Sequence, residues 1–433
     1  MPVFLDSRQD DFETAFRTLL GAKREDSPDV ESVVSEIIAD VRARGDAAVL
    51  ELTAKFDRLE LDASRLRISE AEIEAECARV PDAERQALET AAERIRAYHV
   101  RQMPQDQSWT DPEGATLGWR WGAVSAAGLY VPGGLASYPS SVLMNAIPAK
   151  VAGVERLAIC VPTPDGVVNP AVLLAARIAG VDEIYRIGGA QAIAALAYGT
   201  ESIAPVDKIT GPGNAFVAAA KRRVFGKVGI DMIAGPSEIL VIADGDNDPD
   251  WIALDLMSQA EHDESAQALL ICTDEAFGRR VAEAVEARLQ TLERREIAGA
   301  SWRDFGAVIT VADLDEAAAL SNRIAPEHLE LCVADPEALA GKCQHAGAIF
   351  LGQWTPEAIG DYVGGPNHVL PTARSARFSS GLSVMDFLKR TTLARMTPDS
   401  LRAIGPAAEV LARSESLEAH GLSVTARLEK LNR

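Results

Sequence analysis

The chain has 433 residues, which is too long for a single hydrophobic core and predicts about two to four domains. Its formal net charge of −21 opposes long-range attraction to nucleic acid or to anionic membranes. No apolar run approaches the ~20 residues that a membrane span needs, and the first residues lack a charged leader followed by an apolar core. The sequence therefore predicts a cytoplasmic protein that binds neither nucleic acid nor membrane.

The first part of the chain is predicted to be mainly helical. Residues 1–28 mix polar and apolar positions and are expected to form an N-terminal arm. From Val30 to Val41 apolar residues recur at helical spacing, and Gly45 is expected to end this helix. A second helical region covers residues 69–100, and residues 119–124 are strand-like.

From Tyr130 onward, strand-like runs alternate with helices. The first series has strands near residues 157–161 and 183–187, with helices near 170–180, 190–198 and 215–225. The second series has strands near 239–243, 268–272, 307–311, 329–333 and 348–351. Alternation at this spacing predicts βαβ units around parallel sheets. Beyond about residue 381 the strand signals stop, and a helical tail is expected.

Two junctions that lead into helices carry glycine, at Gly188-Gly189 and at Gly211-Pro-Gly-Asn214. Glycine lets the backbone approach a bound group closely, and a helix N-terminus favours anions. Two such junctions in one α/β unit indicate a phosphate-bearing cofactor at the carboxyl ends of the strands. The dinucleotide fingerprint G-x-G-x-x-G is incomplete because Phe216 stands where its third glycine belongs, so plain turns are an equally good interpretation.

A candidate metal site begins at the end of a predicted amphipathic helix. Gln259 and His262 stand three residues apart, so they share one helical face. An amide oxygen and an imidazole on one face can form half of a metal site. By itself this stretch also fits a helix end with polar neighbours. Further polar groups in a glycine-rich loop and near the C-terminus favour a bound ion: Asp361, His368 and His420.

Glu327 and His328 lie between a predicted helix and a strand that begins at Leu329. Histidine suits proton transfer near neutral pH, and a neighbouring carboxylate can activate water if burial raises its pKa. The pair could equally be a solvent-facing loop. The cysteines show no paired spacing and are expected to be buried thiols: Cys77, Cys160, Cys272, Cys332 and Cys343.

Taken together, these stretches resemble the histidinol dehydrogenase family across essentially the whole chain. The motifs that carry the resemblance follow one another in the family's order: Tyr130-Val-Pro-Gly-Gly134, Gly211-Pro-Gly-Asn214, Ser258-Gln-Ala-Glu-His-Asp263, Ala325-Pro-Glu-His-Leu329 and Gly360-Asp-Tyr-Val-Gly-Gly-Pro-Asn-His-Val-Leu-Pro371. The resemblance implies a cytoplasmic, zinc-dependent homodimer. It implies oxidation of L-histidinol through L-histidinal to L-histidine with two NAD⁺, the last steps of histidine biosynthesis.

The same resemblance implies an α/β fold, similar to that of aldehyde dehydrogenases, with two incomplete Rossmann-like parallel-sheet domains. Residues 1–28 are expected as the arm, and residues 29–129 together with 238–381 as the domain of the catalytic and metal site. Residues 130–237 are expected to form the NAD-binding domain. Residues 382–433 are expected to form a helical tail used in dimerisation.

By resemblance, each site residue takes a role. The implied zinc ligands are Gln259, His262, Asp361 and the partner subunit's His420. The implied catalytic pair is Glu327 and His328. The implied cofactor contacts are Tyr130, Gln191 and Asn214. The zinc ligands and His328 are also implied to contact the substrate, together with Ser237, His368 and Glu415.

The implied chemistry has two oxidations with a hydration between them. His328 takes the hydroxyl proton while hydride leaves for NAD⁺, and Glu327 activates the water that adds to the aldehyde. No cysteine lies in a shared motif, which favours a hydrated aldehyde over a thioester. Three other interpretations remain. One is a dehydrogenase of the same scaffold acting on another alcohol, and another is a zinc hydrolase in which Glu327 activates water. The third is a non-catalytic binding protein, which would leave every polar motif unexplained.

Overall fold

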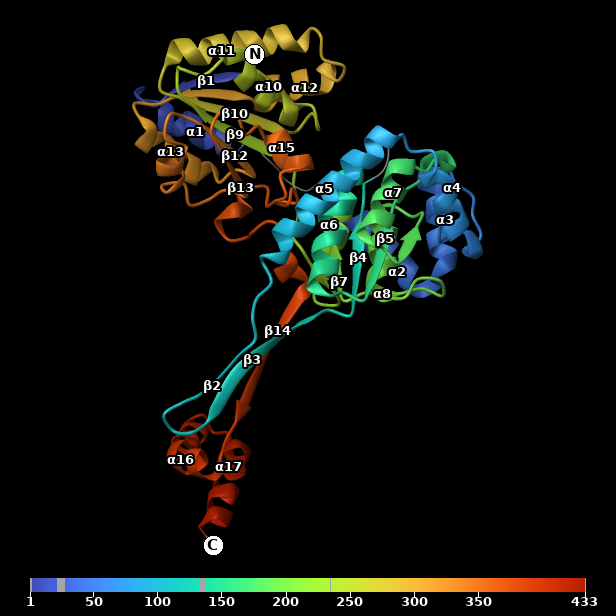
Figure 1. Ribbon diagram of the computed structural model, residues 1–433, viewed down its shortest axis with the longest axis vertical. Coiled ribbons are helices and arrows are strands. Elements are labelled where there is room, and N and C mark those ends of the chain that lie inside the picture. Colours follow the sequence, from blue (N-terminus) through green and yellow to red (C-terminus); the bar gives the residue numbers. More distant parts are fainter. Residues whose placement is uncertain (1, 22–27, 133–137, 234, 433) are drawn as a thin grey trace. The chain divides into compact units, whose positions relative to one another are not determined.

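The computed structural model describes residues 2–21, 28–132, 138–233 and 235–432. The chain divides into two compact units, one formed by Met1–Arg101 with Ser125–Phe387 and the other by Gln102–Val124 with Leu388–Arg433. The larger unit holds two parallel β-sheets with helices around them (Figure 1). Within the described ranges, none of the helices combines the length and the apolarity needed to cross a bilayer.

The first sheet of the larger unit has six strands in the order β1-β11-β10-β9-β12-β13, and every pair is parallel. Its central strands are buried on both faces, which explains their nearly continuous apolar sequence. The bounds are β1 (Val3–Asp6), β9 (Glu238–Ala243), β10 (Gln267–Cys272), β11 (Ala307–Thr310), β12 (His328–Cys332) and β13 (Ala348–Leu351).

Helices cover both faces of this six-stranded sheet. Alternate residues of each strand point to opposite faces, so Val241 packs with Leu256 in one core while Leu240 packs with Phe16 in the other. The first core is completed by α10 (Pro249–Ala260), α11 (Glu275–Leu289) and α12 (Arg295–Phe305). The second is completed by α1 (Phe12–Gly21), α13 (Leu314–Ile324) and α14 (Pro336–Ala340).

The second sheet has five parallel strands in the order β6-β5-β4-β7-β8. The chain runs outward from β4 to β6 on one side and then returns to place β7 on the other side of β4. This reversal creates a topological switch point between β4 and β7, where open α/β sheets bind ligands. The bounds are β4 (Ala126–Tyr130), β5 (Arg156–Cys160), β6 (Glu183–Tyr185), β7 (Lys208–Thr210) and β8 (Gly229–Ile230).

The helices of the N-terminal quarter pack with this five-stranded sheet. One core cluster joins its strands to α2 (Pro28–Arg44), α3 (Asp46–Asp57), α8 (Gly189–Tyr198) and α9 (Ala215–Val224). The remaining helices contact one another: α4 (Glu70–Cys77), α5 (Asp82–Val100), α6 (Pro139–Ala152) and α7 (Pro170–Ala179). Residues 29–129 were predicted to share a domain with residues 238–381, whereas α2 and α3 pack in the core of the five-stranded sheet. An apolar stripe on a helix does not specify which sheet the helix packs against.

The smaller unit is a three-stranded antiparallel sheet followed by two helices. The strand order is β14-β3-β2, with β2 (Gln107–Thr110), β3 (Thr116–Ala123) and β14 (Leu388–Arg395). Thr397 forms a capping box with Ser400 at the start of α16 (Pro398–Ser414), and α17 (Glu418–Leu431) follows. The prediction that strands stop beyond residue 381 was therefore wrong. Strand β14 is mostly exposed, so it lacks the alternation that marks a half-buried strand.

The predicted α/β class with two parallel sheets is confirmed, and so is each predicted strand of the second series. Residues 3–21, expected in an N-terminal arm, instead form β1 and α1 of the six-stranded sheet. Short 3-10 turns lie at Ala63–Arg65, Pro164–Gly166, Ser375–Arg377 and Val384–Phe387. All five cysteines are buried and unpaired, as predicted.

Candidate active site

One group of predicted residues gathers at the carboxyl edge of the five-stranded sheet. Tyr130 ends β4, and the turn 211–214 follows β7, so both lie at the switch point. Gly211 has φ +110°, and a Cβ atom there would overlap the carbonyl oxygen of Tyr130. Only glycine lets this turn approach β4 so closely.

Some polar groups at this edge form hydrogen bonds within the protein, and others could bind a ligand. The Tyr130 hydroxyl accepts the N–H of Gly189 at 3.1 Å, and burial raises the pKa of Tyr130 to about 12. Asn214 caps α9 by accepting two backbone N–H groups through Oδ1, which leaves its NH₂ for a ligand. The Oε1 atom of Gln191 is buried without a hydrogen-bond partner among the described residues. A ligand donor would satisfy it.

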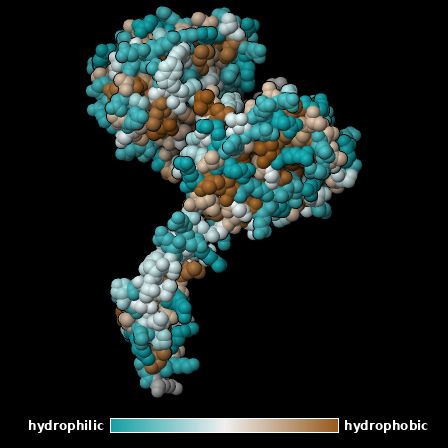
Figure 2. Space-filling model, viewed as in Figure 1, coloured by the Kyte–Doolittle hydropathy of each residue, from teal (hydrophilic) through white to brown (hydrophobic). Residues whose placement is uncertain are grey.

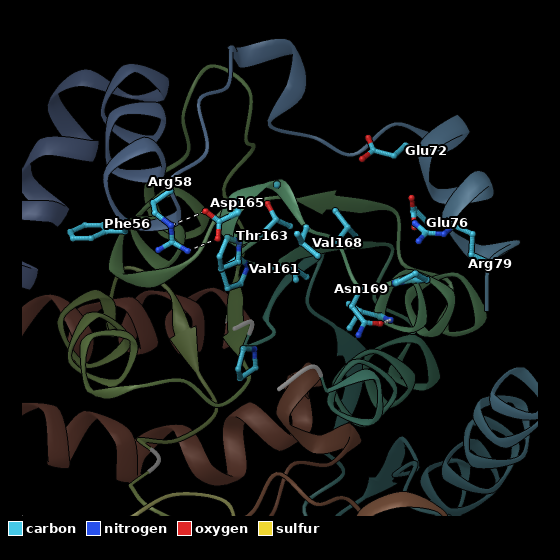
Figure 3. Close-up of a pocket in the computed structure, with 17 residues that line it drawn as sticks. Phe56, Arg58, Glu72, Glu76, Arg79, Val161, Thr163, Asp165, Val168 and Asn169 are labelled. Atoms are coloured by element: carbon cyan, nitrogen blue, oxygen red, sulfur yellow. Dashed lines mark hydrogen bonds and ion pairs between the residues drawn. The ribbon is translucent and has the colours of Figure 1, made fainter. Parts of the chain in front are cut away.

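A cavity of about 850 Å³ opens beside the ends of β4 and β5. Figure 3 shows Arg58 paired with Asp165 on one wall and Glu72, Glu76 and Arg79 on another. Pro132, which follows Tyr130 by two residues, also lines the cavity. The volume is in the range of cofactor-sized sites.

A second group of predicted residues gathers at the opposite kind of edge, the amino ends of β9 and β12. Glu238 begins β9 and His328 begins β12. The backbone N–H of Glu238 donates to Oε2 of Glu327 at 2.9 Å, and the carbonyl oxygen of Glu238 lies 3.1 Å from Nδ1 of His328. One residue of the neighbouring strand thus orients both members of the predicted catalytic pair.

The surroundings of His328 favour the neutral form of its imidazole ring. Its side chain is buried, and desolvation lowers its pKa, an effect that the nearby Asp361 carboxylate opposes. Because Nδ1 donates its proton to the Glu238 carbonyl, the lone pair of the neutral ring is on Nε2. Nε2 is buried without a hydrogen-bond partner in the described part of the chain and lies 3.7 Å from Oδ1 of Asp361. It is free to take a proton from a bound group.

Carboxylates surround this histidine. Glu357, at the start of α15 (Glu357–Tyr362), lies with Oε1 3.4 Å from Nδ1 of His328. Burial raises the pKa of Glu357 well above its ordinary value, and the charge of Asp361 adds to the effect. One side-chain atom each of His328, Glu357 and Asp361 lies within 4.8 Å of the others, so these three could hold a metal ion.

Gln259 and His262 reach the same place from the end of α10. With its NH₂ turned toward Glu357, the Gln259 amide donates to that carboxylate, and its oxygen accepts the N–H of Glu238 at 3.3 Å. A cation on this side would favour the opposite orientation, with the amide oxygen facing it. Nδ1 of His262 is buried without a hydrogen-bond partner among the described residues. Imidazole, carboxylate and amide donors of this kind fit zinc.

A cavity of about 590 Å³ leads to this cluster and is lined by His262, Glu357 and Asp361. Residues of α5 and α6, including Leu88 and Leu143, form its other wall. The site can therefore accept a small molecule that has both polar and apolar parts.

Comparisons with known proteins show which family the chain belongs to. The family model described as histidinol dehydrogenase matches residues 21–428. The chain belongs to the histidinol dehydrogenase family. A histidinol dehydrogenase of Ruegeria pomeroyi is 82% identical and one of Cereibacter sphaeroides is 79% identical, each over 432 residues and the full length of both chains. The crystal structure of histidinol dehydrogenase from Elizabethkingia anophelis superimposes with a TM-score of 0.95 at 37% identity, covering 100% of this chain and 99% of that one.

Membership in the histidinol dehydrogenase family confirms the resemblance seen in the sequence. It makes the chain an NAD-dependent oxidoreductase of histidine biosynthesis. The structure brings together Gln259, His262, Glu327, His328 and Asp361 in one cluster. Ser237 directly precedes β9, next to this cluster. Glu415 and His420 lie in the smaller unit, where both side chains are exposed.

His368, expected to contact substrate, is engaged by protein on both ring nitrogens. Nδ1 lies 2.9 Å from the carbonyl oxygen of Asp361, and Nε2 lies 3.1 Å from Oγ of Ser141. The ring therefore ties α15 to α6. A substrate contact would have to use its carbon edge or replace one of these bonds.

Glu238 and Glu357 belong to the site but were not predicted from the sequence. Glu238 contributes mainly backbone groups, which leave no mark in a sequence. Glu357 stands four residues before Asp361, so the helical spacing alone could have identified it. A second acidic cluster lies behind it, where Glu330 accepts the N–H of Glu357 at 2.6 Å and lies within reach of Asp255 and Cys332.

Proposed function

We propose that this chain is a cytoplasmic histidinol dehydrogenase that oxidises L-histidinol to L-histidine in two steps, with two NAD⁺ and one water. The observation that carries the proposal is the buried imidazole of His328 and the way its two ring nitrogens are placed. Its Nε2 lone pair faces the carboxylate of Asp361 while its Nδ1 is held by the Glu238 carbonyl. Two relatives named histidinol dehydrogenase, 82% and 79% identical over the full length of both chains, support the same reaction.

In the first oxidation, Nε2 of His328 takes the proton of the substrate hydroxyl while hydride leaves the same carbon for the nicotinamide ring. The products are the aldehyde, NADH and protonated His328. Burial favours the neutral ring, so the protonated histidine readily releases its proton before the next step.

The second oxidation needs water. Only the hydrated aldehyde has a carbon that bears a hydrogen and two hydroxyl groups, so that loss of hydride and of one proton gives the acid. Glu327 takes a proton from water as the water oxygen bonds to the aldehyde carbon, and it then passes that proton to the former carbonyl oxygen, which gives a neutral hydrate. His328 then takes a hydrate proton as the second hydride leaves, and histidine forms. Glu327 keeps a fixed position because the Glu238 N–H donates to it at 2.9 Å.

Zinc is the proposed metal, held by Gln259, His262, Asp361 and the partner subunit's His420. When bound, it supplies a positive charge that holds and orients the polar groups of the substrate. Nδ1 of His262, buried with no hydrogen-bond partner among the described residues, and the closely spaced carboxylates of Glu357 and Asp361 support a cation here. Metal analysis of purified protein tests this assignment.

NAD⁺ is proposed to bind at the carboxyl edge of the five-stranded sheet. Tyr130, Gln191 and Asn214 are its proposed contacts, and the cavity beside Pro132 offers room for part of it. Two groups support this placement: the buried acceptor of Gln191 and the NH₂ of Asn214, which no described residue contacts by a hydrogen bond.

A homodimer is proposed, in which His420 of the partner subunit would complete the zinc site; Glu415, the proposed substrate contact, lies in the same unit of the chain as His420. Both side chains are exposed, as a residue that serves a partner must be before assembly. Figure 2 shows hydrophobic residues at the surface of this unit among hydrophilic ones. Val410, Leu411 and Leu422 are each more than half exposed and would be covered in such a dimer.

Absorbance of reduced nicotinamide tests the function directly. Purified protein with histidinol and NAD⁺ is expected to produce two NADH per histidinol, with histidine as the product. NADH formation from another alcohol but not from histidinol would overturn the substrate assignment. Ester or amide cleavage without NAD⁺ would select a zinc hydrolase instead.

A further inference from the structure

A buried ion pair lies directly beneath the turn that follows β7. Lys221, on α9, and Asp231, after β8, form an ion pair, and their side chains are 3% and 0% exposed. Buried charges of opposite sign are expensive to remove from water, and apolar pairs of similar volume are often as stable or more stable. Stability alone therefore does not explain why this position holds two charges.

The pair holds both backbone groups of one glycine. Nζ of Lys221 donates to the carbonyl oxygen of Gly211 at 2.9 Å, and Oδ2 of Asp231 accepts the N–H of Gly211 at 2.8 Å. An apolar pair could satisfy neither group. A buried donor or acceptor left unpaired would cost free energy, so the charges act on the turn itself.

Gly211 is the residue of this turn whose backbone conformation most depends on contacts with other residues. Its φ of +110° is open to glycine alone, and glycine is the residue with the greatest backbone freedom. Two residues on is Gly213, and Asn214 begins α9. Because Lys221 lies on α9, it links the start of the turn to the helix that the turn leads into.

We propose that Lys221 and Asp231 are positioning residues for NAD⁺: they fix the conformation of Gly211 and thereby place Asn214 against the cofactor. Neither side chain touches the cofactor in this proposal. It rests on the NAD⁺ site proposed above and adds the reason why that site keeps its shape when empty. The Gly211 N–H, already bonded to Asp231, is accordingly not one of the donors to the cofactor phosphates.

The test compares two double variants. Lys221→Met with Asp231→Leu removes the charges and both hydrogen bonds to Gly211. Lys221→Met with Asp231→Asn also removes the charges, but its amide oxygen can still accept the Gly211 N–H. Neutral pairs avoid the unpaired buried charge that a single substitution would leave.

Affinity for NAD⁺ is measured by titration of the full-length, metal-loaded protein. We expect the first variant to raise the Kd for NAD⁺ about tenfold and the second to raise it less, since two hydrogen bonds to the turn are lost in one and about one in the other. Histidinol affinity and kcat at saturating NAD⁺ should stay within about twofold of wild type, because the catalytic cluster keeps its contacts.

The matched control is another ion pair of the same sheet, at its amino edge. Arg156 and Glu183 pair at 3.1 Å where β5 and β6 begin. Arg156→Met with Glu183→Leu should lower the melting temperature yet leave the Kd for NAD⁺ unchanged. Equal weakening by the control, or wild-type NAD⁺ affinity in the apolar Lys221–Asp231 variant, would overturn the proposal. If the Lys221→Met, Asp231→Leu variant fails to fold, the Lys221→Met, Asp231→Asn variant is compared with the control instead, and wild-type NAD⁺ affinity in it would overturn the proposal. Wild-type protein that bound no NAD⁺ at all would instead refute the proposed function.

Discussion

Replacing Glu327 with glutamine should separate the two oxidations. The glutamine amide has nearly the same shape, and its oxygen can still accept the Glu238 N–H that now lies 2.9 Å from Oε2. A hydrogen bond to a charged acceptor exceeds one to a neutral acceptor by about 1 kcal/mol, and relief of the buried charge offsets part of that loss. We therefore expect the free energy of unfolding to change by about 1 kcal/mol or less.

The chemical effect should be much larger and should fall on one step. General-base catalysis is worth about 10²–10⁴-fold, so oxidation of histidinal to histidine should slow about 100-fold or more. Interconversion of histidinol and histidinal involves no water and should slow only about threefold or less, since His328 is the base for that step.

Two assays with the same aldehyde make the comparison. With NAD⁺, histidinal is oxidised to histidine, so this assay measures the rate of the second oxidation. With NADH, histidinal is reduced to histidinol, so this assay measures the reverse of the first oxidation. Zinc content and melting temperature serve as controls for an intact site. Equal slowing of both reactions, or a second oxidation at the wild-type rate, would refute the role given to Glu327.

Three further changes probe the other parts of the site. His328→Asn keeps a donor toward the Glu238 carbonyl but deletes Nε2. The rates of both oxidations should therefore fall by about 10²–10⁴-fold with little loss of stability. A folded variant with a tenth of the normal turnover would contradict this. In Gly211→Ala the added methyl group should overlap the Tyr130 carbonyl and force an unfavourable φ, at a cost of about 1–3 kcal/mol. NAD⁺ binding, measured by titration, should weaken. A normal Kd would argue against the close approach of this turn to β4. Burial raises the pKa of Asp255 from 3.8 to about 6, so its ionisation should lower the free energy of unfolding as pH rises through that window. Asp255→Asn should remove about 2–3 kcal/mol of this loss, measured by urea denaturation at pH 8 and at pH 4. Parallel pH profiles of variant and wild type would count against this.

How far the sequence predicts this fold depends on burial. Strands such as β9 and β10 are buried along their whole length, so their apolar runs were unmistakable. Strands β1 and β14 expose much of their surface, and β8 has only two residues. Such strands are fixed by backbone pairing to a neighbour, which the order of side chains does not encode.

The candidate site divides in the same way. The glycine turns led directly to the carboxyl edge of the five-stranded sheet, because positive φ and close approach demand glycine at Gly211. The catalytic cluster lies at amino ends of strands, where no general rule for open α/β sheets places a site. It could be predicted from residue chemistry at Glu327 and His328, whereas the backbone role of Glu238 depends on strand register.

The antiparallel pairing of β3 with β14 has a consequence for how the protein is made. More than half of the chain lies between these two strands, and β3 is the central strand of its sheet. During synthesis β3 leaves the ribosome long before its partner exists, so one side of it stays unpaired in the interim. A nascent or truncated chain ending near Phe387 would present that open edge to other chains, and we expect aggregation to begin there.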